Sequence, residues 1–190
     1  MEQVERLMLA HETEPEHVRQ VARLALGLFD QLAGLHGLGQ RERDWLEAAA
    51  LLHDVGWSVA PAGRGHHKES ARLIAGFEWT VLDCREVTII AQTARYHRKS
   101  LPSPEHSDFM ALVEGDQQLV SKLAGLLRMA DGLDRQHLSK VSSIQVRMTD
   151  DVVTVQVDST GDVSEELAAA AKKADLAEGV FARRFAFATA

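Results

Sequence analysis

The stretch LLHDVGW, residues 51–57, places His53 and Asp54 side by side at the end of an apolar run. The two leucines predict the buried end of a helix, and the glycine predicts that the chain turns soon afterwards. Alone, the pair is better explained as the polar end of a helix, where a histidine faces the negative pole of the helix dipole, than as two metal ligands. The choice therefore depends on whether the rest of the chain supplies further ligands.

Helical periodicity extends over most of the first 140 residues. Apolar residues recur at the spacing of one helix face from Val18 to Leu32, and Thr13-Glu14-Pro15-Glu16 predicts a capping box with proline in the first turn of that helix. Residues 35–39 and 61–65 contain the glycines expected of loops. Further helices are predicted over residues 40–54, 66–76, 83–97 and about 116–135.

The pattern changes after residue 140. Apolar and polar residues alternate over residues 144–148 and again over 153–157, with Thr149-Asp150-Asp151 between them, which predicts a β-hairpin. An alanine-rich helix is expected over residues 162–177, and phenylalanines at alternate positions predict a closing strand near residues 181–187, although Arg183 breaks their pattern. We therefore expect a mainly α protein with a helical domain over residues 1–140 and a small α+β appendage of hairpin, helix and strand over residues 141–190.

Composition narrows the classes of function. A net charge of -7 argues against general binding to nucleic acid or anionic membranes, although a local cationic pocket remains compatible with it. The single cysteine, Cys84, excludes an intramolecular disulfide framework, fits a reducing compartment and is expected to lie in the core. The first ten residues are neither a signal peptide nor a membrane span, so we expect a cytoplasmic protein.

Further candidate metal ligands lie near the ends of the predicted helices. His17, His67 and His97 each lie beside apolar positions, as His53 does, and Asp131 lies inside the most apolar helix. A carboxylate there is costly to bury unless a cation or hydrogen bonds satisfy it. Each residue taken alone also has a simpler explanation. Asp131 could pair with Arg128 or Arg135, three and four residues away on the same helix face, and His17 could be an ordinary polar residue in the first turn of a helix. Imidazole and carboxylate without thiolate suit Mn, Fe, Co, Ni, Zn or Mg.

The order of these residues resembles the metal-binding pattern of the HD superfamily of phosphohydrolases. The closer resemblance is to the C-terminal HD-like domain of the exopolyphosphatase/guanosine-pentaphosphate phosphatase (Ppx/GppA) proteins, and it covers nearly the whole chain. It rests on LLHDVGW, HHKESARLIAGF, ARYHRKSLP, LAGLLRMADGLDR and the tail from IQVRM through VTVQV to VFARRFAF. The resemblance implies an HD-domain helical bundle. The actin-like domains that carry the main activity of those proteins have no counterpart in this sequence, so that activity is not transferred.

The resemblance also implies a ligand set. His17, His53, Asp54 and Asp131 match a site for one divalent metal ion. Positions that hold a second ion in binuclear members of the superfamily are matched by His67 and His97, with His66 competing with His67. Four other histidines are expected at the surface, namely His11, His36, His106 and His137.

The resemblance implies hydrolysis of a phosphomonoester or phosphodiester of a small molecule by metal-activated water, and we expect the substrate to be a nucleotide. Asp54, Lys68 and Arg98 are the candidate catalytic residues. The candidate phosphate-binding residues are Lys68, Arg95, Arg98, Lys99 and Arg128. The alternative is a non-catalytic module that binds a phosphorylated ligand or a partner protein. No nucleic-acid or membrane partner is expected, and the sequence leaves open a homodimer.

Overall fold

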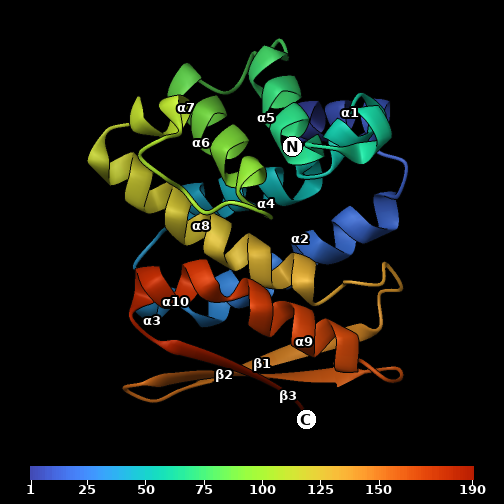
Figure 1. The fold of residues 1–190 in the computed structure, drawn as a ribbon, viewed down its shortest axis with the longest axis vertical. Coiled ribbons are helices and arrows are strands. Elements are labelled where there is room, and N and C mark those ends of the chain that lie inside the picture. Colours follow the sequence, from blue (N-terminus) through green and yellow to red (C-terminus); the bar gives the residue numbers. More distant parts are fainter.

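Helix α8 (Glu114–Gly132) runs through the middle of the molecule, and most other elements pack around it (Figure 1). The computed structural model describes all 190 residues. Helices α2, α6, α9 and α10 contact α8 directly. The other helices, with their bounds, are α1 (Glu2–His11), α2 (Pro15–Gln31), α3 (Ala33–His36), α4 (Gln40–Leu52), α5 (His66–Gly76), α6 (Cys84–Arg95), α7 (Ser107–Met110), α9 (Ser164–Lys173) and α10 (Asp175–Phe181), with short 3-10 turns at Val55–Ser58 and Pro61–Gly63.

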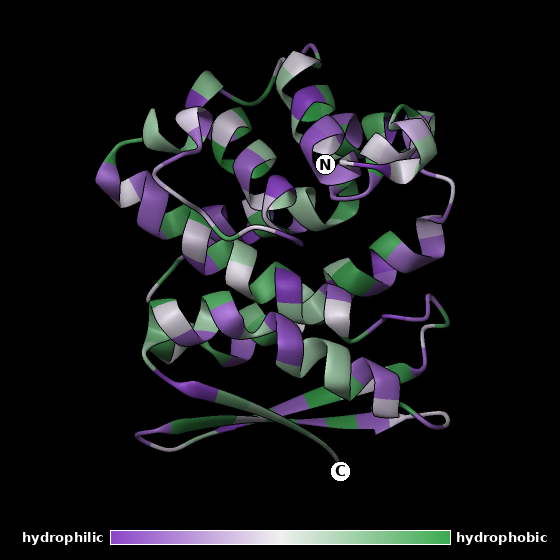
Figure 2. Cartoon of the chain, in the orientation of Figure 1, coloured by the Kyte–Doolittle hydropathy of each residue, from purple (hydrophilic) through white to green (hydrophobic).

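The core follows the predicted helical periodicity. The apolar face of α2 is fully buried. From Leu123 onward, α8 is buried on all of its faces. Figure 2 shows the corresponding alternation of apolar and polar bands along the helices. The buried stripe of α2, together with the residue that follows it, is Val18, Val21, Ala25, Leu28 and Leu32.

The C-terminal region forms a small sheet covered on one side by helices. Strands β1 (Val141–Met148) and β2 (Val152–Ser159) are the predicted antiparallel hairpin, and β3 (Arg184–Thr189) pairs in parallel with β2, so that the strand order is β1-β2-β3. Helices α9 and α10 lie between α8 and the sheet (Figure 1). The predicted fold class, mainly helical with a small α+β appendage, is confirmed. The domain boundary at residue 140 stays a prediction.

Two local predictions of helix structure were wrong. The predicted helix over residues 162–177 is two helices, α9 and α10. They divide at Asp175, whose carboxylate accepts the backbone N–H of Leu176 and binds Arg128 on α8. No capping box forms at Thr13–Glu16: the N-cap is Glu14, whose side chain makes no capping bond.

Two predictions of burial were also wrong. Cys84 is exposed, because it is the first residue of α6 and lies outside the buried face of that helix. His36 is buried rather than at the surface, because its Nε2 lies 2.7 Å from the carbonyl oxygen of Phe29 and its ring packs on that residue.

Glu86 is a buried carboxylate that ties α6 to α4. It accepts hydrogen bonds from the Trp45 indole, the Arg41 guanidinium and the backbone N–H of Asp83, each at 3.0 Å. Burial raises the pKa of Glu86, but these hydrogen bonds outweigh it and hold the pKa below its usual value. The ionised carboxylate therefore stabilises the fold at neutral pH.

We expect Glu86→Ala to lower the free energy of unfolding by about 1–3 kcal/mol at pH 7, because it removes three hydrogen bonds and leaves a buried indole N–H unpaired. Because the folded pKa lies below the unfolded one, this stabilisation is present above the unfolded pKa of about 4.3 and is lost as the pH falls through the folded pKa. Urea denaturation of both proteins between pH 3 and 7 measures it. A difference that does not shrink in acid contradicts the role of the charged form.

Candidate metal centre

Four histidines from four helix ends turn their Nε2 atoms toward one point. They are His17 in the first turn of α2, His53 just after α4, His66 at the start of α5 and His97 just after α6. The Nδ1 atom of each faces an oxygen: Asp134 Oδ2 at 2.8 Å, and the carbonyls of Ala50 at 2.6 Å, Gly63 at 3.0 Å and Ala94 at 2.7 Å, respectively. An oxygen acceptor at Nδ1 places the proton there, so that the Nε2 lone pair can bind a metal. The Nε2 atoms of His17 and His53 have no other partner, whereas that of His66 lies 3.2 Å from Arg98 Nη1.

Two aspartates complete the group. Asp54 Oδ1 lies 3.2 Å from His66 Nε2 and 3.4 Å from His97 Nε2, while its Oδ2 lies 3.7 Å from His53 Nε2 and 4.0 Å from His17 Nε2. Asp131 Oδ1 lies 3.8 Å from His17 Nε2. Ligands bound at about 2.0–2.2 Å to a common ion lie roughly 3–3.5 Å apart, so contractions of a few tenths of an ångström would suffice.

These side chains form three overlapping sets whose ligand atoms lie within 4.8 Å of one another. Asp54 belongs to two of the sets and so lies between two potential ion positions. The Nε2 atoms of His17 and His53 and Oδ1 of Asp54 are buried without a hydrogen-bond partner, which costs about 1–3 kcal/mol for each atom. A divalent cation would satisfy all of these atoms, so the residues fit one. The three sets are His17/His53/Asp54, His53/His97/Asp131 and Asp54/His66/His97.

The electrostatic environment holds these side chains in forms that bind metals. Burial holds the pKa of His97 well below its usual value, so its ring is neutral. Burial opposes ionisation of Asp131, but the Lys173 ammonium outweighs it and keeps the pKa of that carboxyl low. Burial likewise opposes ionisation of Asp54, and the surrounding histidines, His53 foremost, hold its pKa well below the usual value.

The predicted ligands are distributed unevenly around this centre. His17, His53, Asp54, His97 and Asp131 come together, and His66 joins them. His67 belongs to none of the three sets: its ring lies beside that of His66, with centroids 5.9 Å apart. Burial, and then the neighbouring charges of His66 and Arg98, lower the pKa of His67 to about 4.

A cavity of about 500 Å³ opens onto Asp54, His97 and Asp131. Arg98, Lys99 and Arg128 line it, whereas Lys68 is exposed elsewhere and Arg95 pairs with Asp108 at 3.4 Å. Arg128 forms an ion pair with Asp175 at 2.9 Å. Four cationic side chains of the lining have no carboxylate within 4.0 Å: Arg98, Lys99, Arg135 and Lys172. Because the chain is acidic overall, this concentration of unpaired positive charge favours an anionic ligand.

Sequence reasoning missed several residues of this site. Lys172 and Lys173 come from the end of α9, and Asp134 holds His17 from the loop after α8. His137 is exposed, as expected, but it also stacks on His17 with ring centroids 3.6 Å apart and binds Glu14. Only Asp134 had a signal in the sequence, because it follows Asp131 by three residues in LAGLLRMADGLDR.

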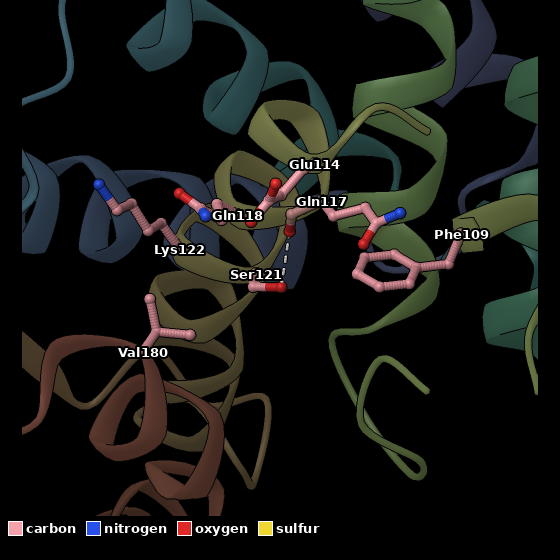
Figure 3. Close-up of a pocket in the computed structure, with 7 residues that line it drawn as sticks. All are labelled: Phe109, Glu114, Gln117, Gln118, Ser121, Lys122 and Val180. Atoms are coloured by element: carbon pink, nitrogen blue, oxygen red, sulfur yellow. Dashed lines mark hydrogen bonds between the residues drawn. The ribbon is translucent and has the colours of Figure 1, made fainter. Parts of the chain in front are cut away.

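A second hollow of about 400 Å³ lies on α8, away from the metal centre (Figure 3). Phe109 and Val180 lie on opposite sides of the polar residues of α8 that form its floor. Its one cation, Lys122, donates to the carbonyl of His36, and its hydroxyl, Ser121, donates to the carbonyl of Gln117. None of the three ligand sets borders it, so it offers no competing centre.

Comparison with known proteins supports the resemblance seen in the sequence. A family model described as Ppx/GppA phosphatase, domain III, matches residues 1–177. The chain belongs to this family. No curated protein matches the chain. In this member of domain III the matched region contains every ligand of the candidate centre and ends shortly after α10 begins. None of its helices has the length and apolarity needed to cross a membrane.

Asp134 holds His17, a candidate ligand, in place, and we expect Asp134→Asn to weaken metal binding by about 10–100-fold. Its two oxygens accept from His17 Nδ1 and from the Ser139 backbone N–H, so an amide loses one of these bonds in either orientation. Competition titration with a metal indicator measures the affinity. Asp158→Asn, an exposed carboxylate on β2, is the control, and equal affinities in the two variants would contradict the assignment.

Proposed function

We propose that this chain is a divalent-metal-dependent phosphohydrolase that cleaves a phosphomonoester or phosphodiester of a small molecule, with nucleotides as the first class to test. The observation that carries the proposal is the convergence of four histidine Nε2 atoms and two carboxylates, with the Nε2 atoms of His17 and His53 and Oδ1 of Asp54 buried and unpartnered. Without a cation there, these three buried atoms have no hydrogen-bond partner, which is costly.

The residues divide into two roles. His17, His53 and Asp54 would hold one divalent ion, and His66 and His97 with Asp54 would hold a second. Asp131 would add a ligand to the first ion, since its Oδ1 lies 3.8 Å from His17 Nε2. An ion bound there supplies Lewis acidity at a phosphoryl oxygen and generates a hydroxide nucleophile from water near neutral pH. Arg98, Lys99, Arg135 and Lys172 bind the phosphoryl oxygens from the side of the cavity. Lys68 and Arg95 take no part, because neither lines the cavity.

One contact favours a second candidate, a non-catalytic module that binds a phosphorylated ligand. The Lys173 ammonium binds Asp131 directly and so neutralises that carboxylate without a metal. Lys173 binds Oδ2 of Asp131, whereas Oδ1 faces His17, so Oδ1 stays available to an ion in a catalytic centre. The catalytic proposal is the stronger one because Lys173 leaves the Nε2 atoms of His17 and His53 unpartnered.

The test is metal analysis of protein purified without chelator, followed by a screen of phosphomonoesters, nucleotides and cyclic nucleotides with Mn, Mg, Co and Ni. We expect bound transition metal and metal-dependent release of phosphate or nucleoside monophosphate. A metal-replete protein that binds no ion contradicts the metal centre. A metal-loaded protein that binds phosphate but turns over no ester supports the module instead.

A further inference from the structure

A second chamber borders the metal centre at His17 and Asp54, whereas the basic cavity borders it at Asp54, His97 and Asp131. Its volume is about 280 Å³. Asp54, Trp57 and His137 line both spaces, so the two chambers meet at one candidate ligand, Asp54, and the two rings beside it. The remaining residues of the second chamber come from the loop before α2, the start of α2 and the turn after α4: Glu12, Thr13, Glu14, His17 and Ser58.

The two chambers have opposite charge. No lysine or arginine lines the second chamber, and three carboxylates do: Glu12, Glu14 and Asp54. The basic cavity contains six lysines and arginines, of which only Arg128 and Lys173 pair with carboxylates. A molecule that spans the metal centre therefore meets cations on one side and carboxylates on the other.

The second chamber contains polar atoms that lack partners. Glu12 Oε1 accepts the backbone N–H of Glu14 at 2.9 Å, but Glu12 Oε2 is buried without any partner. His17, whose side chain is 2% exposed, lines the same chamber, but its Nε2 is assigned to the metal, so Glu12 Oε2 is the acceptor left for a ligand. Ser58 is already bound to Val55 and His11. The buried capacity left in this chamber is therefore for accepting hydrogen bonds, because its two unpaired donors, the Thr13 hydroxyl and the Trp57 indole N–H, belong to exposed residues. A ligand that satisfies Glu12 Oε2 must donate a hydrogen bond to it.

We propose that the second chamber binds the alcohol part of a phosphate ester, and that this part carries hydroxyl or ammonium donors facing Glu12. The inference rests on the proposed function, because it places the phosphate in the basic cavity and the ester oxygen at the metal centre. It narrows the substrate to esters of polyols or amino alcohols. Inorganic pyrophosphate is a poor fit, because its second phosphate would face Glu12 and Glu14 across a space that contains no lysine or arginine.

Binding of phosphonates to the Mn-loaded protein tests this without turnover, because their carbon–phosphorus bond is not hydrolysed. Methylphosphonate is the reference ligand, aminoethylphosphonate carries an ammonium, and dihydroxypropylphosphonate carries hydroxyls. We expect at least one donor-bearing ligand to bind about tenfold more tightly than methylphosphonate by calorimetry, as one hydrogen bond to a carboxylate allows. The ligand that shows the gain identifies the donor.

Glu12→Gln is expected to remove that gain and leave methylphosphonate binding unchanged, because the amide NH₂ then takes the place of the unpartnered oxygen. Glu16→Gln, an exposed carboxylate on α2 that lines neither chamber, is expected to keep the gain. Equal binding of all three phosphonates, or a gain that survives in Glu12→Gln, overturns the second-chamber proposal while the phosphohydrolase proposal stands. No binding of any phosphonate overturns both.

Discussion

Asp54→Ala is expected to abolish stoichiometric metal binding and to lower metal-dependent turnover by at least about 10³-fold. Asp54 is the residue that the His17/His53 set and the His66/His97 set share, so its removal damages both ion positions at once. It also removes the carboxylate whose oxygens lie within 4.0 Å of the Nε2 atoms of all four histidines. No other single residue of the centre has both effects.

The measurement is metal content by mass spectrometry together with the rate of phosphate release for the best ester found in the screen. Asp116→Asn is the matched control, because Asp116 is also a buried aspartate but pairs with Arg85 on α6, away from the ligand sets. We expect the control to keep its metal. Retained metal in Asp54→Ala would place the centre elsewhere, and retained turnover would identify a contaminating phosphatase.

In LLHDVGW, His53 is both the end of a helix and a member of the candidate metal centre. His53 does end helix α4, and its Nδ1 faces the carbonyl of Ala50 in the last turn of that helix. That bond fixes the proton on Nδ1 and turns a free Nε2 toward Asp54 and the other ligands. Sequence periodicity predicted the end of the helix correctly because Leu51 and Leu52 are buried, as the pattern requires.

The sequence did not distinguish His66 from His67 as a ligand. Both lie in the first turn of α5, and which of them faces the centre depends on how that helix is rotated about its axis. That rotation is set by contacts of α5 with α6 and with the turn at Val55–Ser58, and these are long-range. The lysines of α9 were missed for a related reason. An alanine-rich helix has no single apolar stripe, and the close packing of α8 on Ala170 at Gly132 is what turns Lys173 toward Asp131.

Gly56→Ala is expected to lower the free energy of unfolding by about 2–4 kcal/mol and to reduce metal binding with it. A β-carbon at this position would lie 2.1 Å from the carbonyl oxygen of His66 and 2.4 Å from the backbone nitrogen of Ser70. Both are backbone atoms of α5, so no side-chain rotation relieves the clash. Helix α5 must move away, and it carries His66 with it.

Urea denaturation and metal titration of the same samples measure the two effects together. Gly115→Ala is the matched control, because a β-carbon there meets no atom within 4 Å and its effect is expected to stay within about 1 kcal/mol. The backbone N–H of Gly56 also donates to Ser70 Oγ at 2.9 Å, so displacement of α5 breaks a buried hydrogen bond as well. If Gly56→Ala were as stable as the control and bound metal normally, the close approach of this turn to α5 would not be what positions His66.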